Sequence, residues 1–180
     1  MKTLISVILI GATWIVQGQV VVTNNAKLSF FSEAPIENIM AESNAVESTL
    51  NLASGTIYFK VAITTFKFNK SLMQKHFNES YMESSKYSSA EFKGKINGQI
   101  DLTKAGTYPV IVQGDLNIHG VVKHYMVKAE LNVKGEEITA NCVFQVKLAD
   151  HHIKIPRLVI KNITEAVQVT VSALYKPVSK

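Results

Sequence analysis

The stretch GDLNIHGVVK, residues 114–123, places a histidine and a glycine between two runs of alternating apolar residues. Apolar residues lie at even positions before this pair and mainly at odd positions after it. A period of two is typical of a strand that buries one face. A two-residue loop explains the change of parity, because Ile118 and Val121 then form a cross-strand pair whose side chains share a face. The stretch therefore predicts a β-hairpin that turns at His119 and Gly120, with His119 as a ligand contact or metal ligand as the alternative.

The same alternation extends to both sides of the hairpin. Further strands are predicted at residues 55–68, 90–101, 136–148 and 166–175, with weaker ones at about 26–32 and 36–42. The parity changes within 55–68, which indicates a β-bulge near Thr64 and Thr65. Two glycines, Gly94 and Gly98, fall on the apolar face of their strand, where they allow a sharp bend or leave room for another group.

One helix is predicted at residues 69–82, with Asn69 as its N-cap. Its apolar face carries Leu72, Met73, His76, Phe77 and Tyr81. The helix is either a structural plug at the end of a barrel or a mobile lid over a ligand mouth.

The first residues, MKTLISVILIGATWIVQGQV, combine one lysine, an apolar run and a small-residue boundary. This pattern predicts a signal peptide at residues 1–18 that is cleaved after Gly18, with an uncleaved signal anchor as the alternative. Residues 19–180 then form one domain. No cysteine lies near the boundary, so the chain is not expected to be a lipoprotein. The lone Cys142 is expected to be a buried hydrophobic residue rather than a reactive thiol.

The net charge is +5, and Arg157 is the single arginine among the 19 basic residues. A nucleic-acid surface usually concentrates basic residues and uses arginine to read bases. We therefore expect no nucleic-acid partner, while transient contact with an anionic membrane surface stays open. About eight antiparallel strands and one short helix favour an up-and-down barrel over a sandwich.

Neither a metal site nor catalysis is predicted. Adjacent histidines on a strand point to opposite faces, so His151 and His152 would not easily share an ion. The chain has no GxSxG motif, and Asp150 beside His151 is the only tempting acid–histidine pair. These residues are expected to lie in a solvated loop, and the chain is expected to be no enzyme and to need no cofactor. A lipid-processing hydrolase that uses Asp150, His151 and His152 is the alternative.

Three segments together resemble the YceI-like family of secreted, lipocalin-like barrels that bind polyisoprenoid chains. They are FKFNKSLMQKHFNESYMES followed by AEFKGKI within residues 66–96, GDLNIHGVVK, and DHHIKIP at residues 150–156. The resemblance implies an all-β, antiparallel lipocalin-like β-barrel with the helix near its mouth. It also implies a periplasmic or secreted location and a long apolar ligand, either an isoprenoid quinone or a polyprenyl phosphate.

An eight-stranded barrel can hold one slender ligand or be filled by its own side chains. The residues expected to contact a lipid are Phe59, Ile63, Met73, Phe77, Phe92, Ile96, Val112, Leu116, Phe144 and Leu148. A head group would stay near the mouth, where Lys70 and Lys75 are the nearest cations. The sequence therefore predicts a protein that sequesters or carries a polyisoprenoid lipid. A cell-envelope stress or interaction module with a filled core is the other alternative.

Overall fold

The hairpin at residues 114–123 is present. The structure is a computed structural model that describes residues 20–33, 38–98, 104–154 and 165–176. Ile118 pairs with Val121, and both turn residues adopt positive φ, 53° at His119 and 73° at Gly120. These angles fit a two-residue turn of type I′, which matches the twist of the strands that it joins. His119 is thus a turn residue, as the parity change predicts.

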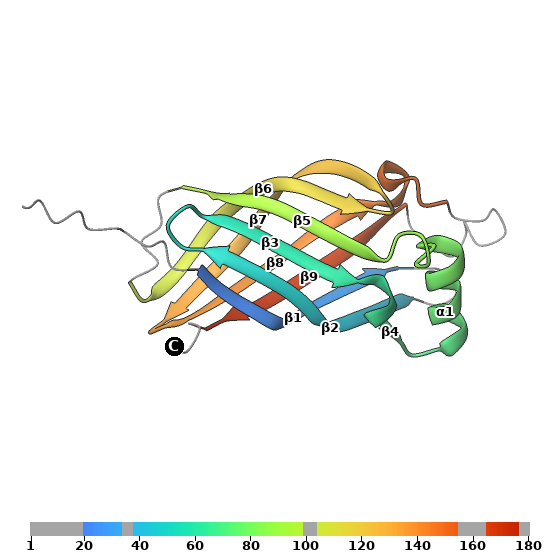
Figure 1. Cartoon of the computed structure of the whole chain (residues 1–180), viewed down its shortest axis with the longest axis horizontal. Helices are drawn as coiled ribbons and strands as arrows, with labels where there is room; N and C mark the ends of the chain where they lie inside the picture. The colour runs from blue at the N-terminus through green and yellow to red at the C-terminus, as the bar shows by residue number, and fades with distance from the viewer. Residues whose placement is uncertain (1–19, 34–37, 99–103, 155–164, 177–180) are drawn as a thin grey trace, which may run out of the picture.

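Eight long antiparallel strands close into a barrel (Figure 1). They are β1 (Val20–Ser32), β2 (Ile39–Asn51), β3 (Thr56–Ala62), β5 (Ser89–Asn97), β6 (Gly106–Ile118), β7 (Val121–Lys134), β8 (Glu137–Lys147) and β9 (Ala166–Tyr175). The order is β1-β9-β8-β7-β6-β5-β3-β2, and pairing of β1 with β2 completes the circle. The barrel prediction is confirmed.

The first two strands are longer than the sequence suggests. The sequence predicts this strand at about 36–42, but β2 runs to Asn51. The second half escapes the prediction because two of its inward residues, Ser43 and Ser48, are polar and hide the apolar alternation. The pairing of β1 with β2 also shifts register between Thr23 and Leu28. Such bulges change the face on which later residues lie, so a period-two pattern fails there.

The predicted strand at 55–68 is two elements. Strand β3 ends at Ala62, a 3-10 turn covers Ile63–Thr65, and β4 (Lys67–Phe68) then pairs with β2. The interruption lies where a bulge was expected, but the chain leaves its neighbour β5 altogether. This turn carries the chain across the barrel end toward the helix.

The predicted helix is α1 (Ser71–His76), which continues as a wider turn, η2 (Phe77–Tyr81). Asn69 is not its cap: Lys70 occupies the N-cap position, and its side chain makes no capping hydrogen bond. The Gln74 side chain instead reaches back, and its Oε1 accepts a hydrogen bond from the Phe68 backbone amide at 3.4 Å. Helix α1 lies across one end of the barrel, called here the helix end (Figure 1).

The end of the barrel away from α1, called here the distal end, is tightly packed. Its core consists of inward residues that are at most 8% exposed: Val21, Leu50, Ile57, Ile96, Val112, Leu131, Val133, Ile138 and Tyr175. The Tyr175 hydroxyl lies 2.6 Å from Ser48 Oγ, which donates a hydrogen bond to the Tyr58 carbonyl at 2.7 Å. Both buried hydroxyls are therefore satisfied, and the distal end is a filled core.

Candidate functional site

A cavity of about 350 Å³ opens inside the helix end. Its wall comes from inward residues of β1, β3, β5, β6, β8 and β9, and its cover comes from residues 63–82. Among the described residues that line the cavity, only Ser32, His76 and Tyr81 have polar side chains, and none is Asp, Glu, Lys or Arg. A space with this lining favours an apolar ligand, because a charged group inside it would lose its hydration without finding a partner.

Four phenylalanines pack together where the cavity meets the helix. The Phe77 ring lies 5.4 Å from Phe30, 5.6 Å from Phe66 and 5.0 Å from Phe68, measured between ring centroids. They come from β1, the 3-10 turn region, β4 and η2, so a single cluster joins the barrel wall to its cover. Aromatic pairs at these separations stabilise the contact beyond the area that they bury.

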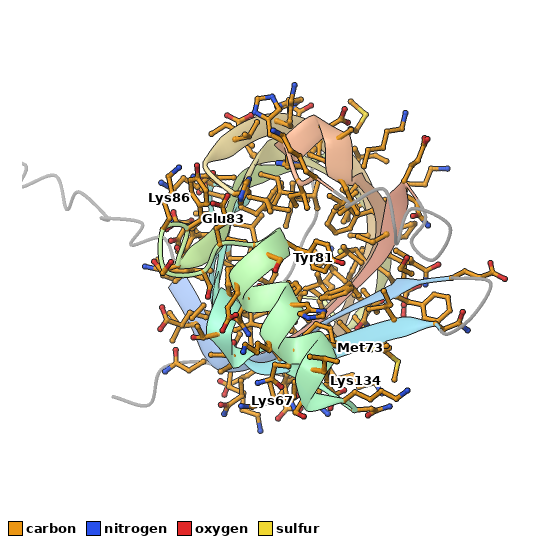
Figure 2. All side chains as sticks on the ribbon, turned by 90° about the vertical axis from the view of Figure 1, so that its right-hand side faces the viewer. Lys67, Met73, Tyr81, Glu83, Lys86 and Lys134 are labelled. Atoms are coloured by element: carbon orange, nitrogen blue, oxygen red, sulfur yellow. The ribbon has the colours of Figure 1, made fainter. Side chains whose placement is uncertain are left out.

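The helix presents the expected face to the cavity, with one exception. Met73, His76, Phe77 and Tyr81 line the cavity, and Figure 2 shows Met73 and Tyr81 on the helix that crosses the barrel opening. Leu72 is 62% exposed and points away. Burial raises the pKa of the Tyr81 hydroxyl, so this group is a neutral hydrogen-bond donor at physiological pH. His76 and Tyr81 could therefore contact a polar head group at the mouth.

His119 has a structural partner outside the cavity. Its Nε2 lies 2.8 Å from a carboxylate oxygen of Glu83, in the segment that follows η2. The Tyr87 ring packs on the His119 ring at 4.2 Å, and a Cβ atom at Gly120 would come within 2.6 Å of the Tyr87 ring. The turn between β6 and β7 thus anchors the segment 83–87. The lining residue nearest to it in sequence is Ile118, and His119 itself does not line the cavity.

His151 is not in a solvated loop, which corrects the sequence-based expectation. It lies in a 3-10 turn, η3 (Leu148–His151), with a side chain that is fully buried. Its Nδ1 lies 3.0 Å from the Val121 carbonyl oxygen, so Nδ1 carries the proton, and Nε2 lies 3.1 Å from the Tyr125 hydroxyl. Burial lowers the pKa of His151, and the neutral ring bridges η3 to β7.

The neighbours of His151 do not join it in an acid–base arrangement. Asp150 is exposed, and His152 is exposed with φ of 55° at the end of η3. Both ring nitrogens of His151 are already occupied by structural partners. Within the part of the chain that the structure describes, no group of three His, Cys, Asp or Glu residues could hold a metal ion.

Six of the ten residues predicted to contact ligand line the cavity: Ile63, Met73, Phe77, Leu116, Phe144 and Leu148. The other four do not. Phe59 and Phe92 lie just below it, and Ile96 and Val112 are buried in the distal core. Contact of any of the ten with a ligand stays a prediction.

Several lining residues were missed by the sequence analysis, among them Phe30, Phe66, Phe68, Ile118 and Val169. The parity of their strands already places them on the apolar face. What the sequence lacks is the height of each residue in the barrel, which depends on the stagger between strands.

Of the two glycines expected on the inward face, Gly94 leaves room for another group, as expected, and Gly98 does not lie on the strand. A Cβ atom built on Gly94 would lie 2.5 Å from Phe92 Cε1, so the Phe92 ring occupies the space above this glycine. Gly94 therefore accommodates a neighbouring side chain of the same strand. Gly98 follows the end of β5 with φ of 114° and lies outside the strand.

Cys142 faces the interior on β8, next to Ala129 on β7. Burial raises the pKa of its thiol to about 11. A thiol of this kind is almost entirely protonated at neutral pH and is a poor nucleophile. Cys142 thus behaves as the small buried residue that the sequence predicts.

The predicted signal peptide at residues 1–18 and its cleavage site lie outside the described residues. No helix among those described is long and apolar enough to cross a membrane.

Comparison with solved structures finds the same barrel in other proteins. A polyisoprenoid binding domain from Saccharophagus degradans aligns over 90% of this chain and 100% of its own, with a TM-score of 0.75 and 14% identity. BcnA from Burkholderia cenocepacia aligns over 83% and 95%, with a TM-score of 0.71 and 14% identity. The YceI protein of Campylobacter jejuni aligns over 80% and 88%, with a TM-score of 0.65 and 14% identity.

A search of curated proteins finds no match. The family model of the YceI-like domain, in contrast, matches residues 19–174, which is most of the chain. The barrel, its short helix and this match agree, and the chain belongs to the YceI-like family.

Proposed function

We propose that this protein binds the apolar chain of a polyisoprenoid-type lipid in the cavity at the helix end, and carries or sequesters it without chemical change. The observation that carries the proposal is the cavity itself, whose described lining is almost entirely apolar and which lies under a short helix. The domain from Saccharophagus degradans, which shares the fold, is described as polyisoprenoid binding.

The head group of the lipid would lie at the mouth. None of the described residues that line the cavity is cationic, so none of them would neutralise a phosphate there. A quinone head would find hydrogen-bond donors in Tyr81 and His76, whereas a polyprenyl phosphate would need the lysines on the helix, Lys70 and Lys75. The lining favours the quinone, because it offers hydrogen-bond donors and no described cation. Either head group is compatible with a lipid whose tail enters the cavity first.

The location that we propose is the periplasm or the extracellular space, reached through the signal peptide at residues 1–18. Mass spectrometry of the mature protein tests this: cleavage after Gly18 leaves Gln19 as the first residue. A chain that keeps residues 1–18 in the membrane fraction would instead identify a signal anchor.

Transient contact of the helix end with a membrane would allow the lipid to enter. Phe31 and Met40 are exposed neighbours on β1 and β2 near this end, and Leu72 is exposed on α1. Sedimentation with vesicles of phosphatidylglycerol, compared with phosphatidylcholine, should show weak binding that Leu72→Asp with Met40→Asp abolishes. Equal recovery of the double variant with the vesicles would contradict this contact.

Organic extraction followed by mass spectrometry tests the main proposal. Protein made with its signal peptide in a Gram-negative host should yield an isoprenoid lipid in stoichiometric amount. Phe77→Asp places a charge in the aromatic cluster under the helix and should reduce the lipid at least about tenfold, while the melting temperature of the lipid-free protein changes by only a few degrees.

Leu174→Asp is the matched control, because it places the same charge on an exposed residue of β9 near the distal end and should leave the lipid unchanged. Folded wild-type protein that yields no lipid above background would favour a filled-core module. If Phe77→Asp unfolds the protein, the helix is a structural plug and not a lid.

A further inference from the structure

On six strands the lining of the cavity stops at a definite inward residue. On β1, β3, β5, β6, β8 and β9, the deepest lining residues are Leu28, Val61, Ala90, Leu116, Phe144 and Val169. The next inward residues toward the distal end are Ala26, Phe59, Phe92, Gly114, Cys142 and Val171, and none of these lines the cavity. These six residues are called the floor layer.

Two bulky side chains dominate the floor layer. Ala26, Gly114, Cys142 and Val171 are small or of moderate size, so four of the six strands contribute little volume. Phe59 and Phe92 are directly paired neighbours on β3 and β5, and both pack against the distal core and against the residues around the cavity. Their two rings therefore separate the cavity from the filled half of the barrel.

The position of the Phe92 ring is fixed by its surroundings. The ring lies over Gly94, where a Cβ atom would come within 2.5 Å of it. Gly94 in turn pairs with Gly114, and a Cβ atom at Gly114 would collide with the backbone of Lys93 and Gly94. The strands β5 and β6 thus approach closely below the ring, and the missing side chains leave a hollow that the ring fills.

We propose that Phe59 and Phe92 are specificity-determining residues that limit the length of the lipid tail. The inference rests on the proposed function and adds the chain length that the site accepts. A water-sized group takes roughly 30 Å³ in a liquid, so a cavity of about 350 Å³ has room for about twelve groups of that size, such as the carbon atoms of a tail. The tail that fits above the floor is thus two to three isoprene units long, and a longer tail leaves its remaining units outside the barrel.

The test is a chain-length series. Linear isoprenoid alcohols with two, three, four and five isoprene units displace the fluorescent probe N-phenyl-1-naphthylamine from delipidated protein. For the wild type, affinity should increase at least about tenfold from two to three units, because more apolar surface is buried, and less than about threefold with each further unit.

Phe92→Ala removes six ring carbons, close to the five carbons of one isoprene unit. It should move the point at which affinity stops increasing from three units to four. Phe31→Ala is the matched control: it removes the same ring from the exposed outer face of β1 and should leave that point at three units. If the thermal melt of Phe92→Ala shows that this variant does not fold, two other variants replace it. Phe92→Leu opens the floor by a smaller amount, and Phe59→Ala opens it by an equivalent amount.

The outcomes separate this inference from the proposed function. If affinity for the wild type keeps increasing about tenfold through five units, the floor proposal is wrong although lipid binding stands. The floor proposal is also wrong if neither floor variant shifts the break, or if Phe31→Ala shifts it as much as a floor variant does. If no alcohol of any length displaces the probe from the folded wild type, the proposed function itself fails.

Discussion

The two halves of the barrel interior are built from the same alternating pattern but end in different states. At the distal end, short turns join β2 to β3 and β7 to β8, and side chains such as Leu131 and Tyr175 are fully buried in the core. At the helix end, the chain between Ala62 and Ser89 crosses the opening, and a cavity lies beneath it. An apolar inward face is therefore compatible with a core or a binding site, and the end of the barrel decides between them.

The difference should be largest in the response to truncating a leucine. Leu131→Ala, in the distal core, should lower the free energy of unfolding by about 3 to 5 kcal/mol, because a fully buried side chain leaves a cavity that cannot collapse. Leu148→Ala, which only enlarges an existing cavity, should cost about 1 kcal/mol. Urea unfolding of the delipidated proteins measures both. Equal losses would show that the two halves are equally packed.

Alkaline pH should weaken the floor layer between the two halves. The pKa of Cys142 rises from 9.0 to about 11 on folding, so the folded state holds this proton more tightly. The resulting stability is present below pH 9 and is lost as the pH rises through about 11. Two pKa units correspond to about 2.7 kcal/mol.

Between pH 9 and pH 11, the free energy of unfolding of Cys142→Ala should therefore fall less than that of the wild type, by about 2.7 kcal/mol. Urea titrations of both proteins at constant ionic strength measure the difference, since the tyrosines and lysines titrate alike in both. Parallel pH profiles would show that Cys142 is not held in an apolar environment.

The contrast between the halves also shows what the sequence can predict. Between Gly106 and Lys147 the strict alternation predicts the strands, the turn at His119 and the inward face, because these strands keep one register. In β2 the inward serines Ser43 and Ser48 and the shifted register with β1 conceal a strand. Ser48 bonds to Tyr58 and Tyr175 on other strands, and Ser43 bonds to Thr65 in the 3-10 turn, which the sequence does not reveal.

The site was predicted in part for a related reason. A period of two identifies the face on which a residue lies but not its height along the barrel. Leu116 and Ile96 both face inward, yet Leu116 lines the cavity and Ile96 belongs to the distal core. The stagger between strands sets this height, and it depends on turns and bulges throughout the chain. His151 was misplaced because an Asp-His-His run is polar, whereas its partners come from β7.

His151 should stabilise the helix end by a smaller amount. His151→Ala removes a buried ring with two hydrogen-bond partners, Val121 and Tyr125, and should cost about 2 kcal/mol. The pKa of His151 is lowered on folding, so its contribution is present above pH 6.5 and is lost as the pH falls below that value.

The wild type should accordingly lose more stability than His151→Ala when the pH is lowered from 7.5 into the range below 6.5. Chemical unfolding at several pH values measures this difference. His152→Ala is the control, because its side chain is exposed and should leave the profile unchanged. A wild-type profile that matches His151→Ala would contradict the buried neutral ring.

The smallest effect is expected at the contact between Glu83 and His119, which anchors the segment after the helix. The Glu83 side chain is 48% exposed, so Glu83→Gln should change the free energy of unfolding by only about 0.5 kcal/mol. Because the contact holds the cover of the cavity, the same change should nevertheless accelerate release of bound probe, measured by stopped-flow displacement. Glu79→Gln, which changes an exposed acid on η2, is the control. Equal release rates for both variants and the wild type would contradict this role of the Glu83–His119 contact. The cavity would then open without breaking that contact, and the aromatic cluster around Phe77 would hold the cover in place.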